Sequence, residues 1–231
     1  MTGSGRIRFL LLHLGPALLS GALLLALDRT AIDSTVSGWF FDPATGTFPL
    51  RYNAAFEIVA HHWAKYVVIL IASVVIGTLL LSFVIPDLKP RRRLLLFLSL
   101  ALTLAPAAVS LLKAGSPRHC PYDLAEYGGY ASYLGLLDTG PPGQAPGHCF
   151  PSGHASAGFC LLAFYFVGVD LRNRGVALAG LCGGLAAGML FGLARIAQGA
   201  HFLSHNLWAG LVCWLVILVL YFALAEPGAP R

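Results

Sequence analysis

Long, continuously apolar runs of residues are the feature that most constrains what this chain can fold into. They lie at about Phe9–Leu27, Val67–Ile85, Leu94–Leu112, His154–Val169, Gly175–Ala194 and Leu207–Ala225. A helix needs roughly 20 predominantly apolar residues to cross the hydrocarbon core of a bilayer. The runs do not alternate apolar and polar residues with a period of two, as the strands of a membrane β-barrel would. We therefore expect an all-α, polytopic membrane bundle with six transmembrane helices.

Composition supports a membrane protein and argues against a soluble one. Of the 231 residues, 57% are hydrophobic and only 11% are charged, whereas a soluble domain carries about 25% charged residues. The first apolar run follows Arg6 and Arg8 as in a signal peptide, but it is longer than the roughly 7–15 apolar residues of a signal core. We expect it to be an uncleaved anchor, and residues 1–231 to form one integral membrane domain.

The net charge of +5 comes from basic residues whose positions follow the predicted membrane topology. They lie before the first run, between the second and third runs, and between the fourth and fifth. In that order they are Arg6 and Arg8; Lys89, Arg91, Arg92 and Arg93; and Arg172 and Arg174. All of these positions fall on one side of a six-helix topology, which is the positive-inside pattern. We therefore expect cytoplasmic N and C termini in a bacterial inner membrane, and no nucleic-acid partner. The sequence contains no signal of an oligomeric state.

Two connections on the opposite, outward side carry unusual polar side chains. Residues 113–154 include Lys113 and Arg118, and residues 194–206 include Arg195 and two histidines. Chain order places both connections at the same membrane surface. A purely structural bundle has no need to gather cations and imidazoles there, so we expect these loops to form an active site that faces the periplasm.

The stretch Pro151-Ser152-Gly153-His154 stands where the fourth apolar run begins. Proline suits the first turn of a helix, serine caps it, and glycine allows a ligand close to the backbone. The N–H groups of a helix start attract anions, and a histidine there can exchange a proton near neutral pH. The stretch is typical of a phosphate site with an acid–base group. The alternative is an ordinary capped helix whose histidine faces interfacial water.

Phosphoryl transfer requires cations and N–H donors around the phosphate, a nucleophile in line, and an acid for the leaving group. The available cations are Lys113, Arg118 and Arg195. His201 or His154 can attack phosphorus as a neutral imidazole, and the remaining histidine can protonate the leaving oxygen.

His205 follows His201 by four residues, so the two side chains would share one face of a helix. Such a pair can share a hydrogen bond, and it can also bind zinc. Because Lys113 and Arg195 would repel a metal ion, we expect no metal at this site.

Three sequence blocks in this order resemble the type-2 phosphatidic acid phosphatase superfamily, membrane branch. The signature of that family is K-x6-R-P, then P-S-G-H, then S-R-x5-H-x3-D. Here the first block starts at Lys113 and ends at Pro121, and the second is intact at 151–154. The third runs from Ala194 to His205 with its spacing kept. With the expected helices, the resemblance extends to nearly the whole chain.

Three positions depart from the signature. Cys120 stands where the family has the arginine of the first block, and Arg118 is the nearest arginine. Ala194 replaces a serine, and His205 replaces the aspartate that orients the nucleophile. A neutral histidine at that last position can orient His201 but stabilises its cation less, which puts rate and pH optimum in doubt more than reaction type.

The resemblance implies a metal-independent lipid phosphate phosphatase that needs no cofactor. His201 would attack and become phosphohistidine, His205 would orient it, and His154 would protonate the leaving group and then activate water. The implied phosphate ligands are Lys113, Arg118, Arg195, Ser152 and Gly153. The implied substrate is a polyprenyl diphosphate, a glycerophospholipid phosphate or lipid A.

Two other functions remain open at this point. A lipid-to-lipid phosphotransferase of the same family would share the first half-reaction. A non-enzymatic transporter or metal-binding bundle would use His154, His201 and His205 as polar or ligating groups. A transporter usually carries ionisable groups near the middle of the bilayer, and the apolar runs have very few.

Cys120 and Cys149 share the outward connection, whereas Cys160, Cys182 and Cys213 lie in apolar runs. If the outward side is an oxidising periplasm, we expect a Cys120–Cys149 disulfide that ties the first motif block to the second. The alternative is a pair of free thiols.

Overall fold

The computed structural model describes residues 3–58 and 64–224. Within these ranges the chain is helical and forms no β-strand, only two isolated bridges. The helices are α1 (Gly3–Leu27), α2 (Ile32–Gly38), α3 (Ala54–Glu57), α4 (Ala64–Leu81), α5 (Arg92–Ala114), α6 (Gly153–Phe159), α7 (Ala163–Asp170), α8 (Arg174–Ala197) and α9 (Leu203–Leu224). The predicted all-α class is confirmed for the described part of the chain.

Among the described residues, five helical segments are long and apolar enough to cross a membrane. They are Ile7–Leu27, Pro86–Ala114, Gly153–Asp170, Arg174–Ala197 and Leu203–Leu224. The second predicted run forms α4, whose apolar part, Lys65–Leu81, is shorter. This helix ends at Leu81 rather than Ile85 because the chain turns there toward Pro86. The count of six spanning helices therefore stays a prediction, and Ala225, its last predicted residue, lies outside the described residues.

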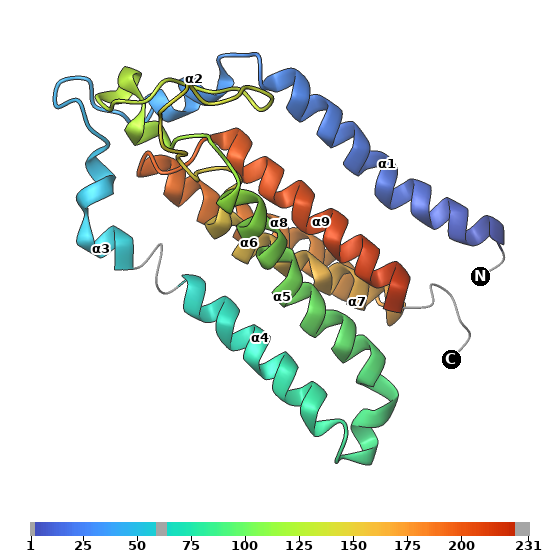
Figure 1. Ribbon diagram of the computed structural model, residues 1–231. Coiled ribbons are helices and arrows are strands. Elements are labelled where there is room, and N and C mark those ends of the chain that lie inside the picture. Colours follow the sequence, from blue (N-terminus) through green and yellow to red (C-terminus); the bar gives the residue numbers. More distant parts are fainter. Residues whose placement is uncertain (1–2, 59–63, 225–231) are drawn as a thin grey trace.

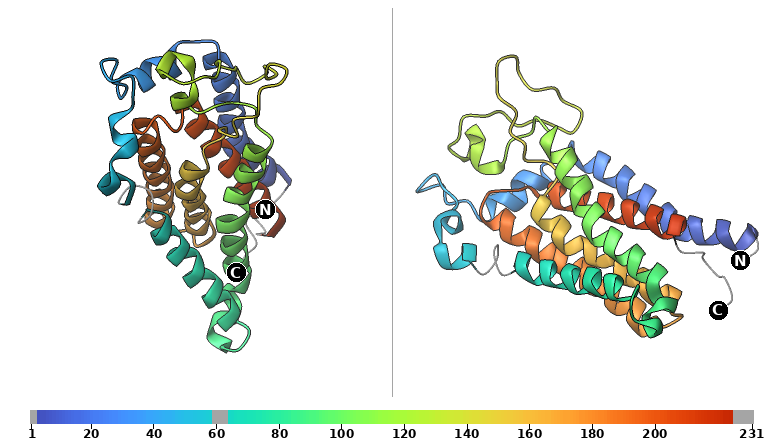
Figure 2. Two further views of the ribbon diagram at one scale, coloured as in Figure 1. Left: turned by 60° about the vertical axis from the view of Figure 1, so that its left-hand side comes forward. Right: turned by 60° about the horizontal axis from the view of Figure 1, so that its bottom comes forward.

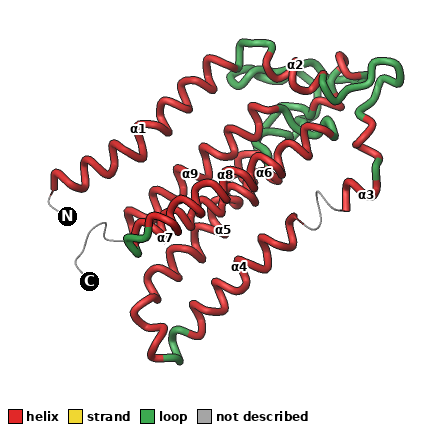
Figure 3. The backbone as a smooth tube through the Cα atoms, turned by 180° about the vertical axis from the view of Figure 1, so that it is seen from behind, coloured by secondary structure: helices red, strands yellow, loops and turns green. Residues whose placement is uncertain are grey.

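Helix α9 is the centre of the bundle, since it contacts α1, α5, α6 and α8 (Figure 1). Helix α1 lies along one edge, and the hairpin of α4 and α5 forms another (Figure 3). Buried aromatic rings fill the space between the helices. Phe97 of α5, Phe166 of α7 and Tyr221 of α9 contact one another with ring centroids 4.8–6.3 Å apart.

The connections gather in two groups at opposite ends of the bundle. Helices α2 and α3 and the long segment between α5 and α6 lie at one end (Figure 2). The α4–α5 turn, the α7–α8 turn and both described chain ends lie at the other (Figure 1). The basic turns and the polar outward loops are thus separated along the bundle, as the predicted topology requires. Which end faces the cytoplasm stays a prediction.

Glycines spaced four apart let α8 lie directly against α6 and α7. A Cβ atom on Gly180 would come within 2.3 Å of the backbone nitrogen of Tyr165, and one on Gly184 within 2.6 Å of that of Leu162. A Cβ atom on Gly188 would meet the ring of Phe159 at 2.3 Å. Small residues at this spacing allow membrane helices to pack backbone to backbone. This contact positions the outward end of α8 beside the start of α6.

Enlarging one glycine of this contact should force the helices apart. We expect Gly184→Leu to lower the free energy of unfolding by about 1–3 kcal/mol, the usual cost of overpacking. Gly183→Leu is the matched control, because a Cβ at that position has no atom within 4 Å. Thermal unfolding in detergent, followed by tryptophan fluorescence, measures both. Equal destabilisation by the two variants would contradict the packing argument.

Candidate active site

A cavity of about 570 Å³ opens where the outward ends of four helices meet. Its lining includes Lys113 from the last turn of α5, Gly153 and His154 from the first turn of α6, Arg195 from the last turn of α8, and His201 from the segment before α9. These five of the eight predicted catalytic and phosphate-binding residues come from all three motif blocks. The structure therefore brings together groups that lie up to 88 residues apart in the chain, from Lys113 to His201.

Ser152 is buried and does not line the cavity. Its side chain caps α6 by accepting a hydrogen bond from the N–H of Ala155 at 3.4 Å. Its own N–H donates to the carbonyl oxygen of His205 at 3.0 Å. The predicted cap is present, and it links the second motif block to the third. Beside it, Gly153 has open space where a side chain would stand, so its backbone is accessible to a ligand.

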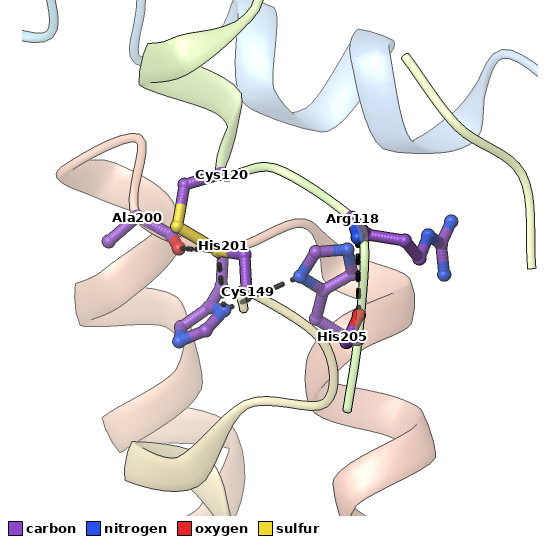
Figure 4. Close-up of a disulfide and its surroundings, with 7 residues drawn as sticks. Arg118, Cys120, Cys149, Ala200, His201 and His205 are labelled. Atoms are coloured by element: carbon purple, nitrogen blue, oxygen red, sulfur yellow. Dashed lines mark hydrogen bonds between the residues drawn. A yellow bond between two sulfur atoms is a disulfide. The ribbon is translucent and has the colours of Figure 1, made fainter. Parts of the chain in front are cut away.

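His201 is 4% exposed, and its Nδ1 faces inward. That atom lies 3.4 Å from Nδ1 of His205 and 3.6 Å from Sγ of Cys149 (Figure 4). The other ring nitrogen, Nε2, points away from these groups. Burial lowers the pKa of His201 well below its ordinary value, and the charges of Lys113 and Arg195 lower this pKa further. The imidazole is thus kept neutral, which leaves a lone pair for attack.

His205 is fully buried behind His201 and does not line the cavity. Because the two Nδ1 atoms are 3.4 Å apart, one ring donates a hydrogen bond to the other. If Nδ1 of His201 is the donor, its Nε2 is unprotonated and nucleophilic. His205 must then carry its proton on Nε2, an atom with no hydrogen-bond partner among the described residues. An aspartate here accepts only, whereas a histidine allows either direction of the bond.

The start of α9 is held by a carboxylate from another segment. Asp33 of α2 accepts hydrogen bonds from the backbone N–H and the hydroxyl of Ser204, the former at 2.8 Å. Ser204 lies between the two histidines in sequence, so this cap fixes the turn that carries them. Burial raises the pKa of Asp33, although the bonds from Ser204 oppose that shift.

Three residues at the site, Lys65, Glu57 and Gln198, are absent from the predicted set. Lys65 of α4 lines the cavity, and Glu57 of α3 accepts a hydrogen bond from Arg195 at 3.3 Å. Gln198 donates to the same carboxylate oxygen at 2.7 Å and accepts from Arg195 at 2.7 Å. A lysine at the outward end of an apolar run departs from the positive-inside pattern, which is a sequence signal for Lys65. No comparable signal marks Glu57.

Arg118 lies outside the cavity, with its guanidinium directed elsewhere (Figure 4). The group donates to Asp28 at the end of α1 at 3.2 Å and to the carbonyl oxygen of Leu134 at 2.9 Å. Both side chains of the ion pair are less than 8% exposed. Arg118 thus joins α1 to the outward loop, and the structure does not bring it to the other phosphate-ligand candidates.

Cys120 and Cys149 form the predicted disulfide (Figure 4). The N–H of Cys149 donates to the carbonyl oxygen of Arg118 at 2.9 Å. Its Sγ lies 3.0 Å from the carbonyl oxygen of Ala200, a contact without a proton because a disulfide sulfur has none to donate. The disulfide therefore joins the first block to the second and packs against the third.

Comparisons with known proteins agree with this arrangement. The model of the PAP2 superfamily matches residues 94–226, more than half of the chain and all three motif blocks. A lipid A 4'-phosphatase of Francisella tularensis subsp. novicida (strain U112) is 26% identical over 198 residues, which cover 82% of this chain and 85% of that protein. No solved structure matches the chain significantly.

The buried ion pair predicts a structural role for Arg118. Removing one partner of such a pair costs about 3–5 kcal/mol, because the other charge stays buried and unpaired. We expect Arg118→Met and Asp28→Asn each to lower thermal stability in detergent, and the double variant to lose less than the sum. Strict additivity of the two losses would show that the pair is not coupled in the folded protein.

Proposed function

This chain belongs to the PAP2 superfamily, and from that premise we propose that it is an integral membrane lipid phosphatase that forms a phosphohistidine on His201. The observation that carries the proposal is the cavity itself. One end of it holds Lys113, His154, Arg195 and His201. The rest runs along mostly apolar side chains, with hydroxyls from Ser73, Thr103 and Ser110 among them. The cavity therefore suits a molecule with a phosphate head and a hydrocarbon body.

The apolar part of the cavity is formed by α4 and α5. Its lining includes Val68, Ala72 and Ile76 of α4, and Leu102 and Pro106 of α5. From Lys65 to Ile76 the helix rises about 16 Å, at about 1.5 Å per residue. That length accommodates a substantial part of an acyl or prenyl chain while the phosphate stays among the cations.

The proposed reaction has two steps. Nε2 of His201 attacks phosphorus, the bond to the leaving oxygen breaks, and His154 gives that oxygen a proton. Water then attacks the phosphohistidine while His154 takes its proton, so the products are a lipid alcohol, or a lipid phosphate from a diphosphate, and phosphate. Lys113 and Arg195 neutralise the phosphate oxygens. We propose Lys65 as the third cation, because Arg118 is engaged by Asp28.

The substrate we favour is lipid A, since the similar Francisella protein is a lipid A 4'-phosphatase. A polyprenyl diphosphate and a glycerophospholipid phosphate are the competing candidates. We place the site at the periplasmic face of the inner membrane, because the basic turns lie at the opposite end of the bundle. A panel of these lipids in detergent, with phosphate release as the readout and EDTA in a parallel series, tests substrate and metal dependence together.

Substrates with different leaving groups should distinguish the roles of His154 and His201. An aryl phosphate leaves without protonation, whereas a lipid alcohol needs an acid. We expect His154→Ala to lower release from the lipid at least about 100-fold but to retain much of the aryl phosphatase activity. His201→Ala should lose both activities by at least about 1000-fold. Aryl phosphatase activity in His201→Ala equal to wild type would rule out His201 as the nucleophile.

Glu57 should weaken phosphate binding, because its carboxylate and a phosphate compete for Arg195. A partly exposed ion pair is worth about 0.2–1 kcal/mol. We therefore expect Glu57→Gln to lower the KM for the lipid phosphate by about 1.5–5-fold with little change in kcat. Glu126→Gln, an equal charge change in the segment between α5 and α6, is the control. A raised KM in Glu57→Gln alone would show that the carboxylate positions Arg195 rather than competing for it.

A further inference from the structure

Three potential metal ligands lie together on the inner side of the candidate nucleophile. Sγ of Cys149 and one ring nitrogen each of His201 and His205 lie within 4.8 Å of one another. The three side chains are almost completely buried, with at most 4% exposed. They come from the segment before α6, the segment before α9 and the first turn of α9.

Two of the three separations within this group match those around a tetrahedral zinc ion. With Zn–N of about 2.05 Å and Zn–S of about 2.3 Å, tetrahedral ligands lie about 3.4 Å apart for two nitrogens and about 3.6 Å for nitrogen and sulfur. The two Nδ1 atoms are 3.4 Å apart, and Sγ of Cys149 is 3.6 Å from Nδ1 of His201. The third separation, from Sγ of Cys149 to the ring nitrogen of His205, is at most 4.8 Å, so a shift of about 1 Å closes the three ligands on one ion.

The disulfide prevents this as long as it is intact, because metals bind the thiolate and not a disulfide sulfur. We propose that reduction of the Cys120–Cys149 disulfide converts Cys149, His201 and His205 into a binding site for a zinc-class divalent cation. The proposal goes beyond the proposed function, since in the disulfide form the same residues serve only catalysis and packing.

The disulfide offers a route to this change. Cys120 is partly exposed, whereas Cys149 is fully buried. A thiolate of an external dithiol attacks Sγ of Cys120, the Cys120–Cys149 bond breaks, and its electron pair goes to Cys149. The second thiol of the reductant then displaces Cys120, which takes up a proton, and the dithiol leaves as a disulfide. Cys149 is thereby released as a thiolate directly beside His201.

The new thiolate also changes the charge balance that disfavours a metal here. Lys113 and Arg195 lie close enough to lower the pKa of His201, and they would repel a cation held by two neutral histidines alone. A thiolate among the ligands adds one negative charge and is itself stabilised by nearby cations. Three protein ligands leave a fourth position, which water or the thiolate of Cys120 can fill.

Metal binding should inhibit the phosphatase activity. A metal on Nδ1 of His201 leaves the proton on Nε2, so the lone pair needed for attack is lost. This consequence rests on the proposed function, whereas the metal site itself does not. Binding and activity must therefore be measured separately.

Cobalt(II) is the probe, because a tetrahedral thiolate site gives it intense visible bands and a thiolate charge-transfer band. The full chain in detergent is reduced with a dithiol, freed of reductant without oxygen, and titrated with Co²⁺, then with Zn²⁺ as competitor. The oxidised protein is the control, since it keeps the three free cysteines Cys160, Cys182 and Cys213. We expect both bands in the reduced protein and neither in the oxidised one.

Variants identify the ligands, and the two cysteine variants need no reductant. Cys120→Ser leaves the Cys149 thiol free and should bind Co²⁺ unreduced, whereas Cys149→Ser, which lacks the same disulfide, should bind at least tenfold more weakly. His205→Ala, reduced, should also bind at least tenfold more weakly. Equal binding by Cys149→Ser and Cys120→Ser, or no thiolate band in reduced wild type, would overturn the proposal. If Cys120→Ser does not fold, the reduced wild type still decides it.

Phosphatase assays on the same samples complete the test. Zn²⁺ should abolish release by the reduced protein and leave the oxidised protein unchanged. Thiolate-band binding with undiminished activity would support the metal site and refute His201 as nucleophile. Inhibition without a thiolate band would refute the site and leave the proposed function standing.

Discussion

The backbone contact between α8 and the α6–α7 segment is the constraint on which the rest of the structure depends. Arg195 lies in the last turn of α8 and His154 in the first turn of α6, so the closeness of these helices determines whether the two groups reach one cavity. Gly180 and Gly184 permit the approach because they have no side chain at the points of contact. In a bilayer the hydrophobic effect does not hold helices together, and close packing of this kind takes its place.

Polar contacts and a disulfide hold the loops together at the end of the bundle that carries the cavity. The Arg118–Asp28 pair, the Asp33 cap on Ser204 and the Cys120–Cys149 disulfide each join segments far apart in the chain. Buried charges are costly unless they are paired and hydrogen-bonded, and here the two carboxylates have partners. These contacts thus hold an irregular loop without a large hydrophobic core. In the described part of these loops, a small cluster around Phe48 and Phe202 contributes apolar burial.

Burial lowers the pKa of His201 and places the ring beside two further potential metal ligands. A neutral imidazole among cations can attack phosphorus, and the low pKa of His201 follows from the same surroundings. The histidine at position 205 replaces an acceptor with a group that can donate or accept. Under the proposed function, the direction of the His201–His205 hydrogen bond then decides whether Nε2 of His201 can attack phosphorus. Together with Cys149, His205 also creates a set of soft ligands that an aspartate would not provide as well.

The sequence by itself determined the fold class and the order of the long apolar helices, and it predicted most of the residues that line the cavity. Apolar runs without period-two alternation indicate helices, because a helix satisfies its own backbone groups in a bilayer. Motif spacing predicted that Lys113, His154, Arg195 and His201 lie together, and all four line one cavity. The disulfide was also predictable, since two cysteines shared an outward loop. These features depend on local pattern and chain order.

Only the tertiary structure decided which charges face one another. Arg118 is near the first motif in sequence, but Asp28, 90 residues away, turns its guanidinium away from the cavity. Lys65 and Glu57 reach the site from segments outside the motifs, and the 3.6 Å approach of Cys149 to His201 comes from the packing of two loops. The physical reason is that side-chain electrostatics act over a few ångströms in space, and one-dimensional spacing does not report those distances between separate segments.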